Sequence, residues 1–153
     1  MNRQYTQSPS RCDPLPLDVR ESMGVLLRSP ITSAVDEYTL IKRGISAKTY
    51  VRVARRLALP RGAITLEATL RRRLASKPAR LSIDESERLL GITRVFVLAS
   101  ALFSDEAAAR AWLHRPARHL PDADPITPVA LARFDSGVRW LEDRILRTTH
   151  GVC

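Results

Sequence analysis

The histidines are the side chains best suited to hold a metal ion, but their spacing does not fit one. The chain carries three, His114, His119 and His150. A zinc site built on one helix places two histidines four residues apart on the same face. His114 and His119 are five residues apart and Pro116 lies between them, so they do not share a face in this way. We therefore expect surface histidines and no metal site.

Three neighbouring carboxylates could in principle perform acid–base chemistry. Asp84, Glu85 and Glu87 lie close together in the sequence. Paired carboxylates act as general acid and base when their surroundings push their pKa values apart. These three occupy the first turn of a predicted helix, where capping and attraction to the positive end of the helix dipole explain acidic residues better. We assign them no catalytic role.

Motifs for cofactors and nucleophiles are absent as well. The sequence contains no GxGxxG or GxxxxGK[ST] loop and no GxSxG elbow. Cys12 and Cys153 lie near opposite ends without a CxxC pattern, and we expect two reduced thiols. There is no apolar signal-peptide core, and no apolar run approaches the roughly 20 residues of a membrane span. The sequence therefore predicts a cytoplasmic protein that is not an enzyme and uses neither a cofactor nor a membrane.

The positive charge of the chain is concentrated in one stretch. Residues 37–80 carry twelve Lys or Arg against two acids, residues 1–36 balance, and residues 81–153 carry nine Arg against ten acids. The excess of +9 over the whole chain therefore comes from residues 37–80. A folded surface this basic suits a polyanion such as nucleic acid. A solvated, arginine-rich helix surface is the alternative.

Two short helices are predicted to carry this basic stretch. The first runs from Ala47 to about Leu59, with Ser46 as its cap, and Pro, Arg and Gly at residues 60–62 end it. The second spans residues 66–75 and is capped by Thr65. Leucines four residues apart mark its inner side, and arginines cover its outer side. The leucines are Leu66, Leu70 and Leu74.

A helix, a tight break and a basic second helix make the layout of a helix-turn-helix, in which the second helix enters the major groove of DNA. Arginine side chains there neutralise phosphates or pair with the O6 and N7 atoms of guanine. The predicted DNA contacts are Arg61, Arg71, Arg72 and Arg73. Similar helix pairs occur in helical proteins that never touch DNA, and a structural or RNA-associated basic protein is a competing hypothesis.

A long helix is predicted at residues 83–103, and the rest of the chain should pack around it. Ser82 and Glu85 form the Ser-x-x-Glu capping box at its start. A helix of this length spans roughly 30 Å, the width of a small domain. Residues 95–98 are apolar all round, so other elements should cover them. We expect this helix to join two regions with different functions.

The segments before the basic helices are predicted to contain little structure. Pro9, Pro14 and Pro16 interrupt any helical period, and residues 1–36 should be flexible or weakly ordered. Within them, residues 19–27 favour a short helix that ends before Pro30. Residues 38–42 should form a short turn that stops at Gly44.

Further helical segments are predicted after the long helix. Ser104 should cap a helix over residues 105–114, and Pro116 should end it. A loop rich in Pro and Asp follows at residues 119–125. Thr127 and Pro128 then look like a cap with proline at the first helical position, which starts a short turn.

The last predicted helix runs from its cap, Asp135, to about residue 148. Its apolar stripe consists of Val138, Leu141 and Ile145. Gly137 should permit close approach of another backbone, because it has no Cβ.

The order of these segments resembles the antitoxins of the Xre/MbcA/ParS type, over about residues 40–152. The motifs that carry the resemblance are Glu85-Ser86 with Arg88, Trp112-Leu113 with Pro116, Gly137, and His150-Gly151-Val152. The resemblance implies an all-α fold, in which a long central helix joins a helix-turn-helix-like N-terminal half to a small toxin-binding domain. The regions would be residues 1–36, the basic residues 37–80, and residues 81–153.

The resemblance also implies the partners. Antitoxins of this type neutralise a RES-domain toxin, which consumes NAD or transfers ADP-ribose from it, and their C-terminal end reaches into the toxin's NAD pocket. Carried over, the toxin-binding residues are Trp140, Arg144, Arg147, His150, Gly151, Val152 and Cys153. The family further implies a homodimer within a toxin–antitoxin hetero-oligomer, and operator DNA bound for repression of its own operon. A stand-alone helix-turn-helix regulator is the alternative function.

Overall fold

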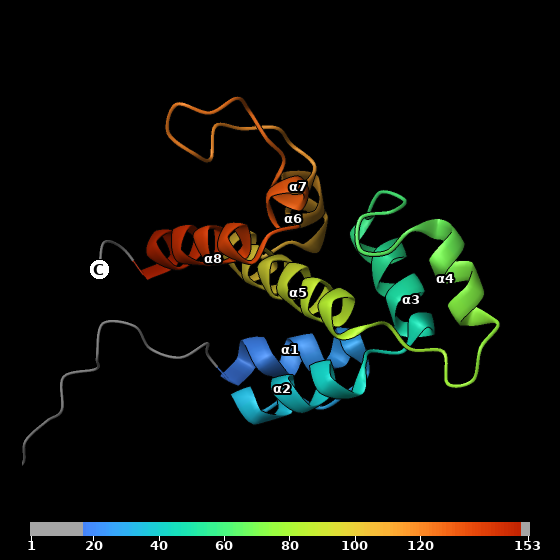
Figure 1. Ribbon diagram of the computed structural model, residues 1–153. Helices are drawn as coiled ribbons and strands as arrows, with labels where there is room; N and C mark the ends of the chain where they lie inside the picture. The colour runs from blue at the N-terminus through green and yellow to red at the C-terminus, as the bar shows by residue number, and fades with distance from the viewer. Residues whose placement is uncertain (1–16, 151–153) are drawn as a thin grey trace, which may run out of the picture.

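The computed structural model describes residues 17–150, and the regular structure of these residues is α-helical (Figure 1). Two isolated β-bridges, one between Ser46 and Arg80 and one between Ala117 and Ile126, tie loops together. The helices are α1 (Leu17–Leu27), α2 (Ala34–Arg43), α3 (Ala47–Leu57), α4 (Glu67–Leu74), α5 (Ile83–Phe103), α6 (Glu106–Leu113), α7 (Pro128–Leu131) and α8 (Asp135–His150). The predicted all-α class is therefore confirmed for the described residues.

Helix α5 forms the centre of the fold and has the predicted bounds. Both hydrogen bonds of its capping box are present: the Glu85 N–H donates to Ser82 Oγ (3.2 Å), and the Ser82 N–H donates to Glu85 Oε2 (2.8 Å). From Leu89 to Ala99, every residue except Arg94 is buried. Helices α1 and α2 cover one side of α5, and α6 and α8 cover the other (Figure 1). The expectation that the chain packs around this helix is confirmed.

Helices α1 and α2 contain more regular structure than the one short helix and the turn that the sequence predicted for this part of the chain. The short helix predicted at residues 19–27 is α1, and the start of α2 also lies within residues 1–36. Both helices pack against α5. Ser33 caps α2 by accepting the Asp36 N–H (3.3 Å), and α2 is much longer than the turn predicted at residues 38–42. Gly44 ends it as predicted, with φ +87°.

Helices α3 and α4 follow the predicted order of helix, break and helix, but their caps differ from the prediction. The Ser46 side chain makes no capping hydrogen bond, and α4 begins after Leu66 rather than after Thr65, whose side chain is buried. Helix α4 buries none of its residues. Of the predicted leucine stripe only Leu70 packs against the core, since Leu66 is 72% exposed and Leu74 is also exposed.

The cap of α6 is also one residue away from its predicted position. Asp105 accepts the Ala107 N–H (3.0 Å), whereas Ser104 ends α5 in a left-handed conformation with φ 50°. Thr127 caps α7 as predicted, by accepting the Ala130 N–H (3.2 Å) ahead of a proline at the first helical turn.

Helix α8 shows the predicted buried side. Asp135 is its first residue rather than its cap, because the Val138 N–H donates to the Phe134 carbonyl (3.0 Å). The predicted stripe is buried: Val138, Leu141 and Ile145. A Cβ at Gly137 would lie 2.0 Å from the Leu131 carbonyl oxygen, so the predicted close approach of another backbone is confirmed.

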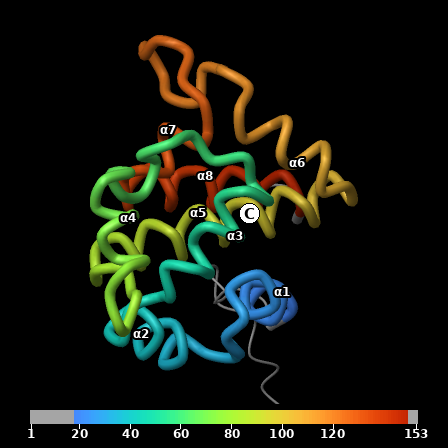
Figure 2. The backbone as a smooth tube through the Cα atoms, turned by 90° about the vertical axis from the view of Figure 1, so that its right-hand side faces the viewer, coloured from blue at the N-terminus to red at the C-terminus, as the bar shows by residue number. Residues whose placement is uncertain are grey.

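One hydrophobic core runs through the described residues. Its fully buried side chains come from helices on both sides of α5, and the largest include Met23, Leu57, Phe96, Leu113 and Leu141. Figure 2 shows α1 and α2 on one side of the molecule and the loop between α6 and α7 protruding on the other. The N-terminal and C-terminal helices therefore share one core. The division of the chain at residues 36 and 80 stays a prediction.

Candidate functional site

Helix α8 presents an exposed face opposite its buried stripe. Trp140, Arg144 and Arg147 are spaced four and three residues apart, so they lie on the same side of the helix. Trp140 is 36% exposed, and both arginines are exposed. The structure thus brings these three predicted toxin-binding residues together. Gly151, Val152 and Cys153 lie outside the described residues, as does the side chain of His150.

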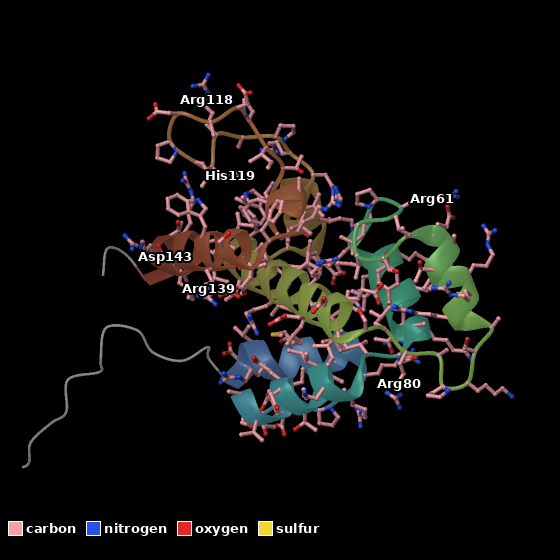
Figure 3. The ribbon with its side chains drawn as sticks, in the orientation of Figure 1. Arg61, Arg80, Arg118, His119, Arg139 and Asp143 are labelled. Carbon is pink, nitrogen blue, oxygen red and sulfur yellow. The ribbon has the colours of Figure 1, made fainter. Side chains whose placement is uncertain are left out.

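Two ion pairs of i,i+4 spacing lie on the exposed part of α8, and one of them includes Arg147 of this face. Arg139 lies 2.7 Å from Asp135, and Arg147 lies 2.8 Å from Asp143. Figure 3 shows Arg139 and Asp143 on the outer side of α8. Such exposed pairs contribute only about 0.3–0.5 kcal/mol to helix stability. They do, however, place charged residues on the same helix as an exposed aromatic side chain, and protein-binding surfaces often combine an aromatic anchor with a polar rim.

A buried histidine lies near Arg144. His119, in the loop between α6 and α7, is 6% exposed and meets Trp112 edge-on, with ring centroids 6.2 Å apart. Figure 3 shows it turned inward while Arg118 points outward. Burial lowers the pKa of His119, and the charge of Arg144 lowers it further, so the neutral imidazole is favoured. The prediction of a surface histidine is wrong here, because no periodicity in this loop indicates which residue turns inward.

A second cluster that sequence reasoning missed joins α3 to α6. Arg56 donates two hydrogen bonds to the Glu106 carboxylate, at 2.8 and 3.0 Å. Arg110 donates to the Arg56 carbonyl (2.7 Å), and His114 Nε2 lies 2.9 Å from the Leu57 carbonyl oxygen. The hydrogen-bonded pairing raises the pKa of Arg56 and lowers that of Glu106. The partners are 50 or more residues apart, so no local pattern could have indicated these contacts.

The four predicted DNA contacts do not form one free surface. Arg61 lies 3.4 Å from a carboxylate at the start of α4, and Arg73 is ion-paired with Glu85 of the capping box. Arg71 and Arg72 are exposed, and no described acidic residue pairs with them. The structure therefore leaves two adjacent arginines of α4 open to an external partner.

Two surfaces are candidates for binding partners: the α8 face, defined by Trp140, Arg144 and Arg147, and the exposed basic residues around α3 and α4. No helix in residues 17–150 is long and apolar enough to cross a membrane. In the same residues, no three His, Cys, Asp or Glu side chains gather as metal ligands would.

Comparison with known proteins points to the class of the antitoxins. The chain is a distant homologue of the protein named Antitoxin Xre from Pseudomonas putida, with 26% identity over 138 residues. The match covers 88% of this chain and 84% of that protein. No family model matches the chain. The resemblance seen in the sequence motifs is thereby confirmed.

Proposed function

We propose that this chain is an antitoxin that neutralises a RES-domain toxin by blocking the toxin's active site with its C-terminal end. The observation that carries the proposal is the extent of the similarity to Antitoxin Xre, 88% of this chain and 84% of that protein. An overlap of that size cannot be reached without most of the helices on both sides of α5. The similarity therefore extends over most of the chain and is not limited to one common helix pair.

The setting of α8 supports a role in presenting a chain end to a partner. Its apolar stripe is buried, and Arg94 of α5 donates to the Glu142 carboxylate on α8 (3.1 Å). Such support holds an exposed face in a fixed geometry, which lowers the cost of binding. Trp140 is the aromatic anchor of this face, and Arg144 and Arg147 contribute charge beside it.

The proposed inhibition is competition with NAD. A nucleotide pocket carries hydrogen-bond donors and cationic groups for phosphates, and a chain end offers a carboxylate and backbone carbonyls that satisfy the same groups. Gly151 lets the backbone bend without a Cβ clash. The residues assigned to the pocket are His150, Gly151, Val152 and Cys153. Their presence would exclude NAD both from a toxin that degrades it and from one that transfers ADP-ribose.

Removal of the last residues tests this mechanism. A RES-domain toxin is co-expressed with the full chain or with a variant lacking residues 149–153, and growth and cellular NAD are measured. We expect the full chain to restore both and the shortened chain to restore neither. In steady-state assays the full chain should raise the KM for NAD without changing kcat. An unchanged KM with a lowered kcat would contradict competition.

The α8 face is tested separately by an aromatic substitution. Trp140→Ala should weaken toxin binding by roughly thirtyfold, the size of a hot-spot contribution near 2 kcal/mol. Phe134→Ala is the matched control, since Phe134 is a 64% exposed aromatic residue that precedes α8 and is not one of the three residues of the α8 face. Equal losses in both variants, measured by calorimetry, would show that α8 does not present a specific face to the toxin.

The helix pair α3 and α4 supports a second function, binding of operator DNA. Arg71 and Arg72 are exposed on α4, and α4 buries none of its residues. A helix with so little burial gains stability when it meets DNA or a second copy of the chain, which fits a homodimer. The stand-alone regulator is the competing reading, and it predicts operator binding without any neutralisation of a toxin.

A further inference from the structure

Several cations of the basic stretch already interact with other groups of the chain. Arg52 donates to the Leu26 carbonyl (3.0 Å), while Arg56, Arg61 and Arg73 pair with acidic residues. The exposed cations of this stretch that no described carboxylate pairs with are Lys42, Arg43, Lys48, Arg55, Arg71, Arg72, Lys77 and Arg80. These side chains can meet an external anion, and their placement therefore decides where a polyanion binds.

Three of these cations surround one hollow, between the start of α3 and the loop that joins α4 to α5. Lys48, Lys77 and Arg80 line it together with Ser46 and Ser76, and we call it the basic hollow. Its volume is about 330 Å³, and no acidic residue lines it. Figure 3 shows Arg80 at the opposite end of the α3–α4 pair from Arg61. The basic hollow is thus separate from the predicted contact at Arg61.

The charge of the basic hollow sets it apart from two other hollows in residues 17–150. One, between α1 and α5, has Asp18 and Glu106 against a single cation, Arg56. Another, between α2, α5 and α8, has four acids against three arginines. In the basic hollow the charges are three positive and none negative, which suits a phosphate group.

Hydrogen bonds hold the wall of the basic hollow in place. The Ala47 N–H donates to the Ala79 carbonyl (2.8 Å), which joins the start of α3 to the loop before α5. Arg80 Nη1 donates to the Gly44 carbonyl (2.9 Å), which fixes the guanidinium and leaves its other N–H groups available. An incoming anion would therefore meet one cation, Arg80, that is already held in place, and less conformational entropy would be lost on binding than with three free side chains.

We propose that the basic hollow binds a phosphate of a nucleic-acid backbone through Lys48, Lys77 and Arg80. The C-terminal end of α4 forms part of its wall, so exposed Arg71 and Arg72 lie about one helical turn away. A backbone that enters the hollow can continue along these arginines. Contacts of this kind position a protein on nucleic acid without reading its sequence. The inference rests on the proposed DNA-binding function, and it moves the main phosphate contact away from Arg61 and Arg73.

The test removes two charges from the hollow without touching the Arg80 hydrogen bond. The double variant Lys48→Gln, Lys77→Gln is compared with Arg55→Gln, Arg115→Gln, which removes two exposed cations outside the hollow. Binding of a labelled random-sequence duplex, about two helical turns long, is followed by anisotropy at several salt concentrations. The slope of log Kobs against log salt is negative, and we expect its magnitude to decrease by about 2 in the hollow variant. In the control the slope should stay unchanged. Equal thermal midpoints show that both variants fold.

Each other outcome overturns the inference. An unchanged slope in the hollow variant would show that the nucleic acid contacts another part of the chain. An equal decrease of the slope's magnitude in both variants would show that only the net charge matters. A thermal midpoint raised by AMP in the natural chain but not in the hollow variant, with duplex binding unaffected, would assign the hollow to a free nucleotide. If the natural chain binds no duplex at low salt, both the hollow and the DNA-binding function fail. The growth of cells that co-express the toxin with each of these variants tests the antitoxin role independently of nucleic-acid binding.

Discussion

Gly137 decides how closely α7 and α8 approach each other. A Cβ at this position would lie 2.0 Å from the Leu131 carbonyl oxygen, a distance that backbone atoms cannot tolerate. We expect Gly137→Ala to lower the free energy of unfolding by about 1–3 kcal/mol or more, because the corner must open. The gain in helix propensity, about 1 kcal/mol, offsets only part of this cost. Urea denaturation followed by circular dichroism measures the change.

Ser136→Ala is the control for this substitution. Ser136 is exposed and neighbours Gly137 in the first turn of α8, so its replacement should change the free energy of unfolding by less than about 0.5 kcal/mol. A Gly137→Ala variant as stable as the control would mean that the backbone contact with Leu131 is easily relaxed.

Other features at the residue scale show what a sequence can and cannot decide. The capping box at Ser82 was predictable because both partners lie within one turn. By residue type, Ser104 and Asp105 are equally good caps for α6. Asp105 is the cap in the structure because Ser104 takes the left-handed conformation that ends α5. Arg73 was expected outside, but the end of α4 comes close to Glu85, which no local rule indicates.

At the scale of elements, an ion network connects four helices. Arg94 of α5 donates to Glu37 of α2 (2.9 Å) and to Glu142 of α8 (3.1 Å), and Arg20 of α1 donates to Glu37 (3.1 Å). The four side chains are only 14–19% exposed, so water screens these charges poorly. The network therefore ties the N-terminal helices to the helix proposed to bind the toxin.

Removal of the central arginine should be costly and dependent on pH. Arg94→Met leaves two partly buried carboxylates without this cation, and we expect a loss near the lower end of about 3–5 kcal/mol at neutral pH. Burial already raises the pKa of Glu142 against the opposing effect of Arg94, and the variant should raise it further. A carboxyl with a raised folded-state pKa destabilises the fold above that pKa. The deficit should therefore shrink as the pH falls through it.

A second substitution separates the charge from the packing of Arg94. Combined with Glu142→Gln, the Arg94→Met variant should recover part of its unfolding free energy at neutral pH and lose much of its dependence on pH. Urea denaturation at neutral pH and near pH 5 measures both quantities. A deficit that stays constant with pH and is not recovered by Glu142→Gln would show that the aliphatic contacts of Arg94, not its charge, hold the helices together.

The elements themselves were predictable in proportion to the strength of their local signals. Helices α3 and α8 have clear apolar periods and α5 has a clear capping box, and the predicted positions of all three were right within about two residues. Helix α2 was predicted as a short turn because its outer residues, such as Val35 and Tyr38, are apolar but exposed, which blurs its period. The residues of the α8 face were predicted from the family resemblance, whereas the inward position of His119 depends on tertiary packing.

At the scale of the whole molecule, the distribution of charge and the distribution of the core disagree. Charge divides the sequence near residues 36 and 80, and this suggested regions with separate roles. The core does not follow that division, since buried residues from α1, α2 and α3 pack in one cluster with those from α5 to α8. The distribution of charge indicates which surfaces suit charged partners, whereas the packing of apolar side chains decides which segments fold together. The charge distribution therefore does not predict which segments share a core.

A substitution in α1 tests whether the described chain folds as one unit. Met23 is 0% exposed in α1, and both tryptophans, Trp112 and Trp140, lie in the C-terminal helices. Met23→Ala should cost about 2–5 kcal/mol, because the cavity it leaves lies in the common core. Since unfolding of one cooperative unit is detected equally by any probe, the tryptophan-monitored urea midpoint should fall together with the midpoint from circular dichroism.

Val25→Ala is the matched control, because Val25 is on the same helix but 75% exposed, and its replacement should leave both midpoints nearly unchanged. If Met23→Ala lowered only the circular dichroism midpoint, α1 would unfold separately from the helices that carry the tryptophans. A shared core predicts instead that damage on one side of α5 weakens the other. Met23→Ala should then also reduce neutralisation of the toxin near the denaturation midpoint, although Met23 lies in α1 and has no place in the proposed toxin-binding face.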